Sequence, residues 1–347
     1  MSEAPAVNIT MPVFNRYEAT QKALLALRKS SRQIPFEVTV VDNGSEQALV
    51  RRLLEFKEGG LIDHLFLLPR NMGISCAANI GWEMTPAPFY MKLDNDTVMT
   101  DPQWLLKLFR LWRHGDPVST LGGADPETLV KNPGALHTED GILGICTTNL
   151  AGQAILIPRA VSDALGYWSE DYGLYGAEDG DYGLRMNCAG FPQYYYSAQD
   201  FFVDLGKNDS NDTYMARNVD KTKEHRRLFK TEGGGTGLFT INDCLYNLCI
   251  RSWKPLKRYE VTDIDENCRV SLIEREEYVE FRKYLDLCAQ KVNARLQKCK
   301  DRKVFTKDFI AELKSLMARS GQDCQGMLQP RAGFMSPATT ESGNTSS

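Results

Sequence analysis

The sequence of 347 residues lacks both a strong excess of one charge and a long apolar run. Its 41 basic and 45 acidic side chains are spread along the chain, so no basic surface for nucleic acid is expected. No apolar stretch approaches the ~20 residues of a membrane span, and residues 1–7 do not resemble a signal peptide. We expect a cytoplasmic protein, with at most a peripheral contact at the inner face of a membrane.

Several local motifs are also missing. The nine cysteines are scattered, with no C-x-x-C pair and no histidine at zinc-site spacing, so reduced structural thiols are expected. No G-x-G-x-x-G follows the first predicted strand, which excludes a dinucleotide-binding dehydrogenase. The four histidines are expected to be surface or packing residues: His64, His114, His137 and His225.

What is present is the pattern of an α/β protein with enough apolar residues, 42%, for a sizeable core. Short apolar runs alternate with helical patterns in the first half, which predicts a mainly parallel central sheet flanked by helices. Strands are expected at 7–13, 37–41, 64–68, 89–93 and 154–157, and helices at 19–27, from 45, at 77–84 and at 102–112.

The character of the sequence changes from about residue 212, where strand-like runs become fewer. Helices are expected at 240–250, 273–300 and 306–319. We therefore predict an N-terminal α/β domain at 1–210, a mainly helical extension at 211–325 and a disordered tail at 326–347, which is rich in Pro, Gly, Ser and Thr.

Polar clusters follow the first two predicted strands, at Pro12 to Arg16 and at Asp42 to Ser45. Open α/β sheets bind ligands at the carboxyl ends of their strands. Arg16 could reach a phosphate there, and Asp42 could accept hydrogen bonds from a base or a ribose. Taken alone, each cluster also fits an ordinary turn, with Ser45 as a helix cap. Two successive clusters favour a ligand site.

Asp94-Asn95-Asp96 directly follows the apolar strand pattern at 89–93. Residues two apart in an extended segment project to the same side, so the carboxylates of Asp94 and Asp96 repel unless a cation lies between them. Proteins hold Mg²⁺ or Mn²⁺ with one or two carboxylates, and water and diphosphate oxygens fill the other positions. A D-x-D in a surface loop is common by chance, but its position after a strand favours a metal site.

A second acidic cluster, Glu178 to Asp181, precedes Arg185. Acidic residues in a first helical turn complement the helix dipole, and Asp181 with Arg185 is an i,i+4 pair. That interpretation accounts less well for three carboxylates in four residues, just downstream of the aromatic Trp168 and Tyr172. Aromatic faces beside carboxylates suit a sugar ring and its hydroxyls.

Taken together, these segments resemble the ordered motifs of family 2 inverting glycosyltransferases, which have the GT-A fold. The motifs are TMPVFNR at 10–16, VVDNGS at 40–45, RNMG at 70–73, AANIG at 77–81, LDNDT at 93–97 and GAEDGDYGLR at 176–185. The resemblance covers roughly Val7 to Asp204. Counting 70–73 and 77–81 as one, five motifs in the correct order are far more specific than any one of them.

The resemblance implies a role for each matching residue. Asp42 would contact the nucleoside, Asp94 and Asp96 the ribose and the metal–diphosphate, and Asp179 would be the general base. The implied nucleotide and donor site also includes Pro12, Phe14, Asn15, Arg16, Arg70, Asn71, Gly73, Asn95 and Gly152. Acceptor contact or support would come from Trp168, Glu178, Asp181 and Arg185. Many relatives carry a histidine after the last strand, whereas this chain has Asp204 as the candidate metal ligand.

The resemblance therefore implies metal-dependent transfer of a hexosyl group, with Mn²⁺ or Mg²⁺, from a nucleotide sugar to an acceptor hydroxyl with inversion. UDP is the commonest donor nucleotide among such proteins, and the acceptor could be a glycan, a lipid-linked glycan or a small molecule. The C-terminal region lies outside the resemblance and is expected to build an acceptor platform or a partner contact.

Two alternatives remain. A sugar-phosphate nucleotidyltransferase also combines an α/β nucleotide domain with acidic metal ligands, but Met11 to Phe14 is not the Gly-rich loop that this class would place on the first strand. A non-catalytic nucleotide-sugar or carbohydrate-binding module could keep the fold without turnover. Against this, both acidic clusters are intact.

Overall fold

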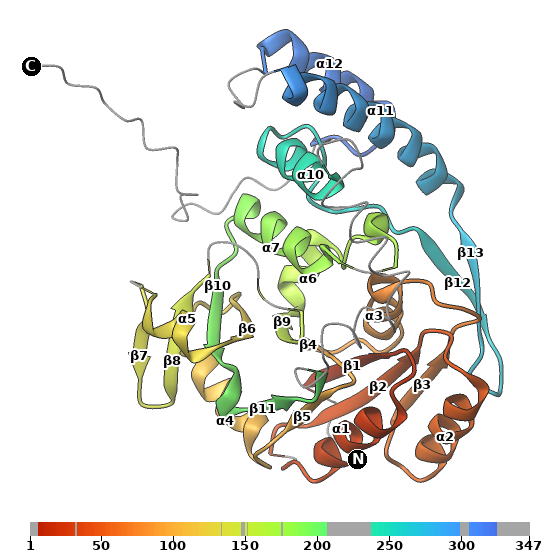
Figure 1. Ribbon diagram of the computed structural model, residues 1–347, viewed down its shortest axis with the longest axis vertical. Helices are drawn as coiled ribbons and strands as arrows, with labels where there is room; N and C mark the ends of the chain where they lie inside the picture. The colour runs from red at the N-terminus through yellow and green to blue at the C-terminus, as the bar shows by residue number, and fades with distance from the viewer. Residues whose placement is uncertain are drawn as a thin grey trace, which may run out of the picture.

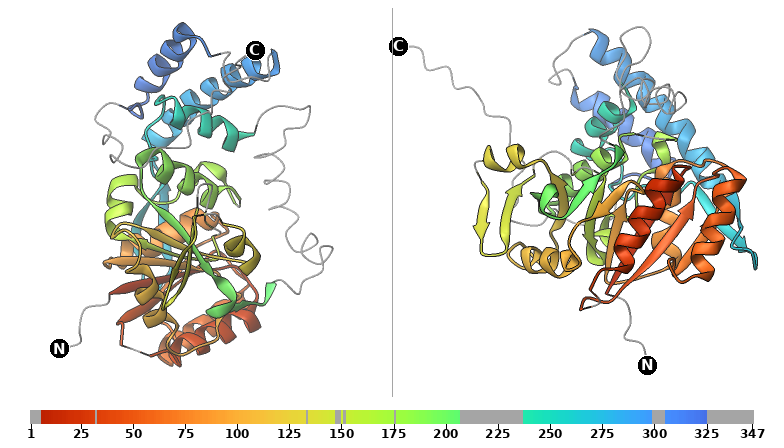
Figure 2. Two further views of the ribbon diagram at one scale, coloured as in Figure 1. Left: turned by 90° about the vertical axis from the view of Figure 1, so that its left-hand side faces the viewer. Right: turned by 60° about the horizontal axis from the view of Figure 1, so that its bottom comes forward.

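A computed structural model of the chain describes residues 6–206, except 32, 133, 147–149, 151 and 175, together with residues 237–298 and 305–324. The predicted tail at 326–347, the predicted boundary at 210 and His225 lie outside these residues. The α/β part and the C-terminal helices α11 (Glu276–Lys298) and α12 (Lys307–Ala318) lie at opposite ends of the long axis (Figures 1 and 2).

A nine-stranded sheet forms the centre of the molecule, with the order β3-β2-β1-β4-β9-β6-β10-β8-β7. Its strands are β1 (Val7–Val13), β2 (Phe36–Asp42), β3 (His64–Leu67), β4 (Phe89–Leu93), β6 (Thr120–Ala124), β7 (Leu136–Thr138), β8 (Gly141–Ile145), β9 (Ala154–Pro158) and β10 (Gln193–Ser197). Strands β1 to β4 run parallel, as do β6 and β10, whereas β9 is antiparallel to both its neighbours. The predicted α/β class with a mainly parallel sheet is confirmed.

Helices cover both faces of this sheet. One face packs against α1 (Tyr17–Arg28), α2 (Gln47–Glu58) and α4 (Trp104–Trp112), and the other against α3 (Ile74–Met84), α6 (Arg159–Leu165) and α7 (Glu178–Ala189). Sequence analysis predicted the five strands from 7 to 157, and all five are confirmed. The sequence pattern did not predict β6, β7, β8, β10, α6, α5 (Pro126–Val130) or the small sheet of β5 (Thr97–Met99) with β11 (Phe202–Asp204).

The C-terminal region contains a hairpin that sequence analysis did not predict. Helices α10 (Leu238–Asn247) and α12 confirm two predictions, but the helix predicted at 273–300 begins only at Glu276. Its first two residues belong to β13 (Val270–Glu274), which pairs with β12 (Tyr259–Ile264) in an antiparallel hairpin. These strands are short and largely exposed, so they carry no strong apolar pattern.

This hairpin packs back onto the N-terminal sheet. The amide of Leu67 in β3 donates a hydrogen bond to the carbonyl of Cys268 at 2.7 Å. The side chains of Tyr259 and Val270 join a buried cluster with Phe66 of β3 and residues of α3. The C-terminal region is thus in contact with the sheet that carries the strand-end motifs.

None of the helices in the described ranges combines the length and the apolar character that crossing a bilayer requires. The eight described cysteines form no disulfide with one another.

Candidate active site

The turns that follow β1 and β4 contact each other at the carboxyl edge of the sheet. The Asn95 side chain donates hydrogen bonds to the carbonyl of Asn15 at 3.3 Å and to the hydroxyl of Thr20 at 2.9 Å. The amide of Asn15 donates to the hydroxyl of Ser45, after β2, at 2.8 Å. Asn15 and Arg16 both have left-handed backbones, with φ of 57° and 61°. Such conformations in non-glycine residues persist where surrounding contacts hold them, often at functional sites.

Asp42 lies at the end of β2, and one of its two buried carboxylate oxygens lacks a hydrogen-bond partner among the described residues. Its side chain is buried, and its Oδ2 accepts a hydrogen bond from the amide of Ser45 at 3.1 Å. Its Oδ1 has no hydrogen-bond partner in the described part of the chain. Burial raises the pKa of Asp42. A base N–H or a ribose hydroxyl would satisfy this oxygen. Pro12 and Phe14, both half-buried, lie in the adjacent strand β1 and in the turn after it.

The segment at 70–73 is held next to the β2 turn by side-chain amides. Asn43 donates a hydrogen bond to Asn71 Oδ1 at 3.0 Å and accepts one from the amide of Met72 at 2.8 Å. Asn71 Oδ1 also accepts from the amide of Gly73 at 3.0 Å. Arg70 is exposed at the start of this segment. The structure therefore brings the predicted nucleotide-binding residues Arg70, Asn71 and Gly73 beside Asp42.

A buried lysine that sequence analysis overlooked lies at the centre of the site. Lys92 of β4 is 2% exposed, and its ammonium donates to Asp94 Oδ1 and to the carbonyl of Gly152, each at 2.5 Å. Burial acts to lower the pKa of Lys92, but Asp94 and Glu178 outweigh it and raise the pKa. The signal in the sequence was a lysine inside an otherwise apolar strand.

The carboxylates of Asp96 and Asp204 both lie next to Gly206. The amide of Gly206 donates to Asp204 Oδ1 at 2.7 Å, and Asp96 Oδ2 forms an ion pair with Arg16. Burial and the nearby Asp94 raise the pKa of Asp96, Arg16 opposes this rise, and Asp204 adds to it. A pocket of about 370 Å³ opens here, lined by Arg16, Tyr17, Glu18, Ala19, Asp96, Leu205 and Gly206.

Within the described ranges, only one group of three His, Cys, Asp or Glu side chains has ligand atoms that all lie within 4.8 Å of one another. It consists of His114, Glu139 and Asp140. His114 Nε2 lies 2.9 Å from Asp140 Oδ2, and the two acidic residues occupy the β7–β8 turn at the far edge of the sheet. The sequence pattern gave no reason to group these residues.

Asp179 lies at the start of α7 beside Gly152. Its Oδ2 accepts a hydrogen bond from the amide of Gly152 at 3.1 Å, and its Oδ1 accepts from the amide of Gly180 at 2.7 Å. The neighbouring Glu178 is buried, and its Oε2 has no partner among the described residues. Burial, reinforced by Asp179 and opposed by Lys92, raises the pKa of Glu178 to about 7. Gly152 therefore lies between the Lys92–Asp94 pair and Asp179.

Three further predicted residues are enclosed in the protein. Asp181 and Arg185 form an ion pair at 2.7 Å between side chains with no exposed surface. Trp168 is 2% exposed and packs against Trp82 and Tyr182. Of the two roles considered for them, acceptor contact or support, this burial favours support.

The region that matches a protein-family model contains the motifs at the ends of β1, β2 and β4. Residues 8–170 match the model of Glycosyl transferase family 2, which confirms the resemblance to this family. The match and the sheet topology confirm the GT-A fold. Asp42, Asp94 and Asp96 lie inside the matched region, whereas Asp179 and Asp204 lie beyond it.

Several solved structures are similar to the chain at low sequence identity. GalNAc-T7 with UDP, GalNAc and Mn²⁺ has 12% identity and a TM-score of 0.47, and the alignment covers 57% of this chain and 43% of that one. TarS of S. aureus has 15% identity and a TM-score of 0.45, with 62% and 39% covered. The mannosyltransferase PcManGT from Pyrobaculum calidifontis, in complex with GDP-Man and Mn²⁺, has 12% identity and a TM-score of 0.47, with 92% and 87% covered.

The chain thus spans less than half of the length of the first two proteins. A search of curated proteins finds no match.

Proposed function

We propose that the protein transfers a hexosyl group from a UDP-sugar to an acceptor hydroxyl with inversion of the anomeric configuration. The observation that carries this proposal is the arrangement around Gly152. Lys92 and Asp94 lie on one side of it and Asp179 on the other. This arrangement supports Asp94 as the group that would face the leaving diphosphate through a cation, and Asp179 as the group that would face the attacking hydroxyl. A glycan, a lipid-linked glycan or a small molecule could supply this hydroxyl, and a cytoplasmic location stays a prediction.

The donor side fits a divalent cation. Asp94, Asp96 and Asp204 offer hard carboxylate oxygens, which Mg²⁺ and Mn²⁺ prefer. Burial and the neighbouring Asp94 and Asp204 raise the pKa of Asp96, and Arg16 opposes this rise, so a cation at this position would stabilise the charged carboxylates further. When bound, Mn²⁺ or Mg²⁺ would stabilise the negative charge of the departing diphosphate. Arg16 lines the same pocket and would contact the phosphates.

On the acceptor side, Asp179 would act as the general base. Its two hydrogen bonds from backbone amides fix the orientation of the carboxylate and still leave it lone pairs for an acceptor hydroxyl. The carboxylate would take the hydroxyl proton as the oxygen attacks the anomeric carbon from the face opposite the diphosphate, which inverts the configuration. A positioned base contributes a factor on the order of 10² to 10⁴ to the rate.

The test is Asp179→Asn in the full chain, which keeps the shape of the side chain and removes its basicity. A panel of nucleotide sugars with Mn²⁺ first identifies the donor from the release of nucleoside diphosphate, and an acceptor array then identifies the acceptor. We expect kcat for transfer to fall by a factor on the order of 10² to 10⁴ while donor binding persists.

The matched control for this variant is Glu178→Gln, which alters the neighbouring carboxylate and should retain much more activity. If Asp179 served only to complement the helix dipole, its loss would cost about 0.3–1 kcal/mol of stability and little activity. A near-normal kcat in Asp179→Asn would therefore contradict the assignment of the base.

A further inference from the structure

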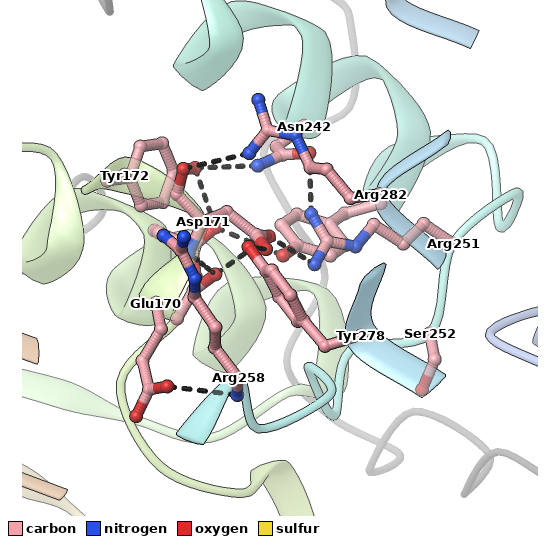
Figure 3. Close-up of polar contacts among 12 residues, drawn as sticks. Glu170, Asp171, Tyr172, Asn242, Arg251, Ser252, Arg258, Tyr278 and Arg282 are labelled. Carbon is pink, nitrogen blue, oxygen red and sulfur yellow. Dashed lines mark hydrogen bonds and ion pairs between the residues drawn. The ribbon is translucent and has the colours of Figure 1, made fainter. Parts of the chain in front are cut away.

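A buried acidic turn connects the family 2 region to the C-terminal helices. The turn η1 (Glu170–Tyr172) begins where the family match ends, and Glu170 and Asp171 are 4% and 2% exposed. Buried carboxylates are costly unless they are paired or hydrogen-bonded. The C-terminal region supplies many of their partners (Figure 3). Glu170 Oε2, for example, accepts backbone hydrogen bonds from Arg258 at 2.9 Å and Tyr259 at 3.2 Å.

Asp171 is the most heavily bonded residue of this turn. Arg251 Nη2 pairs with its Oδ2 at 2.5 Å, and neither side chain has exposed surface. The hydroxyl of Tyr278 donates to its Oδ1 at 2.9 Å, and Arg282 donates to its carbonyl at 3.1 Å. Burial alone would raise the pKa of Asp171, but Arg251 and Arg282 outweigh it and lower the pKa. We call Asp171, Arg251 and Tyr278 the clamp.

Hydrogen bonds lead from the clamp to the first turn of α7. Arg251 Nη1 donates to Asn242 Oδ1 at 2.7 Å, and the Asn242 amide donates to the hydroxyl of Tyr172 at 2.9 Å. The Tyr172 hydroxyl in turn donates to Asp181 Oδ1 at 2.8 Å. The same oxygen accepts from the hydroxyl of Tyr246 in α10 at 3.0 Å. Residues of the C-terminal region therefore hold the first turn of α7.

This turn has a backbone conformation that needs such support. Ala177, just before α7, has a φ of 68°, which is unfavourable for a residue with a Cβ atom. Its carbonyl accepts a hydrogen bond from the amide of Asp181 at 2.8 Å. Asp179 lies between these two residues, so its position beside Gly152 depends on the conformation of this turn.

The nucleotide side of the site is held differently. Gly73 and Met72 donate their backbone hydrogen bonds to Asn71 and Asn43, which belong to the N-terminal sheet and its loops. None of these bonds involves the clamp; one further bond, from the amide of Ile74 to the carbonyl of Leu174 at 3.2 Å, joins the start of α3 to the chain just after η1. Loosening the clamp should therefore displace Asp179 much more than the nucleotide-binding segment.

We propose that Asp171 is a positioning residue, which Arg251 and Tyr278 hold so that the first turn of α7 presents Asp179 to the acceptor. This inference rests on the proposed function, in which Asp179 is the general base. In this role the clamp acts on the acceptor through the first turn of α7 and Asp179.

The test compares Asp171→Asn, which removes the charge, with the milder Tyr278→Phe, which removes one hydrogen bond and keeps the ring. Both are made in the full chain. We expect kcat to fall by about 10- to 100-fold in Asp171→Asn, because small misplacements of a catalytic group have effects of this size. The affinity for UDP with Mn²⁺, measured by calorimetry, should stay at the wild-type value. Amide hydrogen exchange should become faster at 176–183 and not at 70–73.

The control is Asp63→Asn, which breaks the 2.8 Å ion pair with Arg28 away from the site and should leave kcat unchanged. A wild-type kcat in both clamp variants would overturn the inference, as would faster exchange spread over the whole chain. If Asp171→Asn does not fold, Tyr278→Phe provides the same readouts.

Failure of the proposed function would look different. If the wild-type protein transfers no sugar, faster exchange confined to 176–183 still supports the clamp as the support of α7, and unchanged exchange overturns it.

Discussion

At the residue scale, Glu178 is the side chain whose charge depends most clearly on its burial. Its pKa rises from 4.5 to about 7, chiefly because burial disfavours the charged form. A carboxyl group with a raised pKa in the folded state stabilises the fold below its unfolded pKa, and this contribution is lost as the pH rises through the folded value. The contribution of Glu178 to the free energy of unfolding should therefore fall between about pH 4.5 and pH 7 by an amount on the order of 3 kcal/mol.

Glu178→Gln tests this titration, because the amide is neutral at every pH. We expect urea unfolding of the wild-type protein to show a larger loss of stability from pH 5 to pH 8 than that of the variant. At pH 8 the variant should be the more stable of the two. An identical pH dependence would show that Glu178 does not titrate in this range.

The metal ligands are a second question at this scale, because the chain offers two candidate cation sites. We expect Asp96→Ala to abolish the metal-dependent binding of UDP, and Asp140→Ala, in the group with His114, to leave it unchanged. The measurement is calorimetry with UDP and Mn²⁺, with and without EDTA. The opposite result would place the functional metal in the β7–β8 turn.

At the scale of the elements, the strands that carry the donor motifs were predictable. Strands β1, β2 and β4 are almost entirely buried, so they form mainly apolar runs that end abruptly at polar turns. Helix α7 was less predictable, because glycines interrupt it and its start needs a left-handed Ala177. Glycine and a positive φ are both unfavourable locally, and contacts from distant segments stabilise them.

Contacts between elements explain why Lys92 is buried and why the β12–β13 hairpin forms where it does. A lysine in an apolar strand conflicts with the local pattern, and the carbonyl of Gly152 and the carboxylates of Asp94 and Glu178 make its burial favourable. The hairpin strands alternate too weakly to stand out, and the hairpin packs against β3 and α3 through Tyr259 and Val270. In both cases the deciding contacts come from residues that lie far away in the sequence.

At the scale of the whole molecule, the C-terminal region is joined to the α/β part through its core. Tyr246 and Trp253 belong to the same buried cluster as Trp82 and Tyr182. A chain that ends at residue 236 would lose the side chains of Tyr246 and Trp253. It would also leave the Asp171 carboxylate without its guanidinium partner, Arg251. Removing one member of a buried pair typically costs about 3–5 kcal/mol, which is a large share of the stability of a domain.

We therefore expect a truncated chain of residues 1–236 to lose cooperative unfolding and the binding of UDP. If the α/β part folded without the C-terminal region, the truncated chain would instead keep nucleotide binding. Thermal unfolding followed by circular dichroism, with calorimetry for UDP, distinguishes the two outcomes. A truncated monomer with wild-type affinity for UDP would show that the α/β part folds alone.

The sequence by itself determined the α/β class, the order of the donor motifs and the residues at the strand ends. These features depend on local periodicity and on the abrupt change from apolar to polar residues. Both signals can be read within a single segment of the sequence. Only the tertiary structure decided that Lys92 lies between Asp94 and Gly152, that Asp181 and Arg185 are enclosed, and that Asp171 pairs with Arg251. These pairings depend on burial and on contacts between distant segments, and local periodicity carries no information about either.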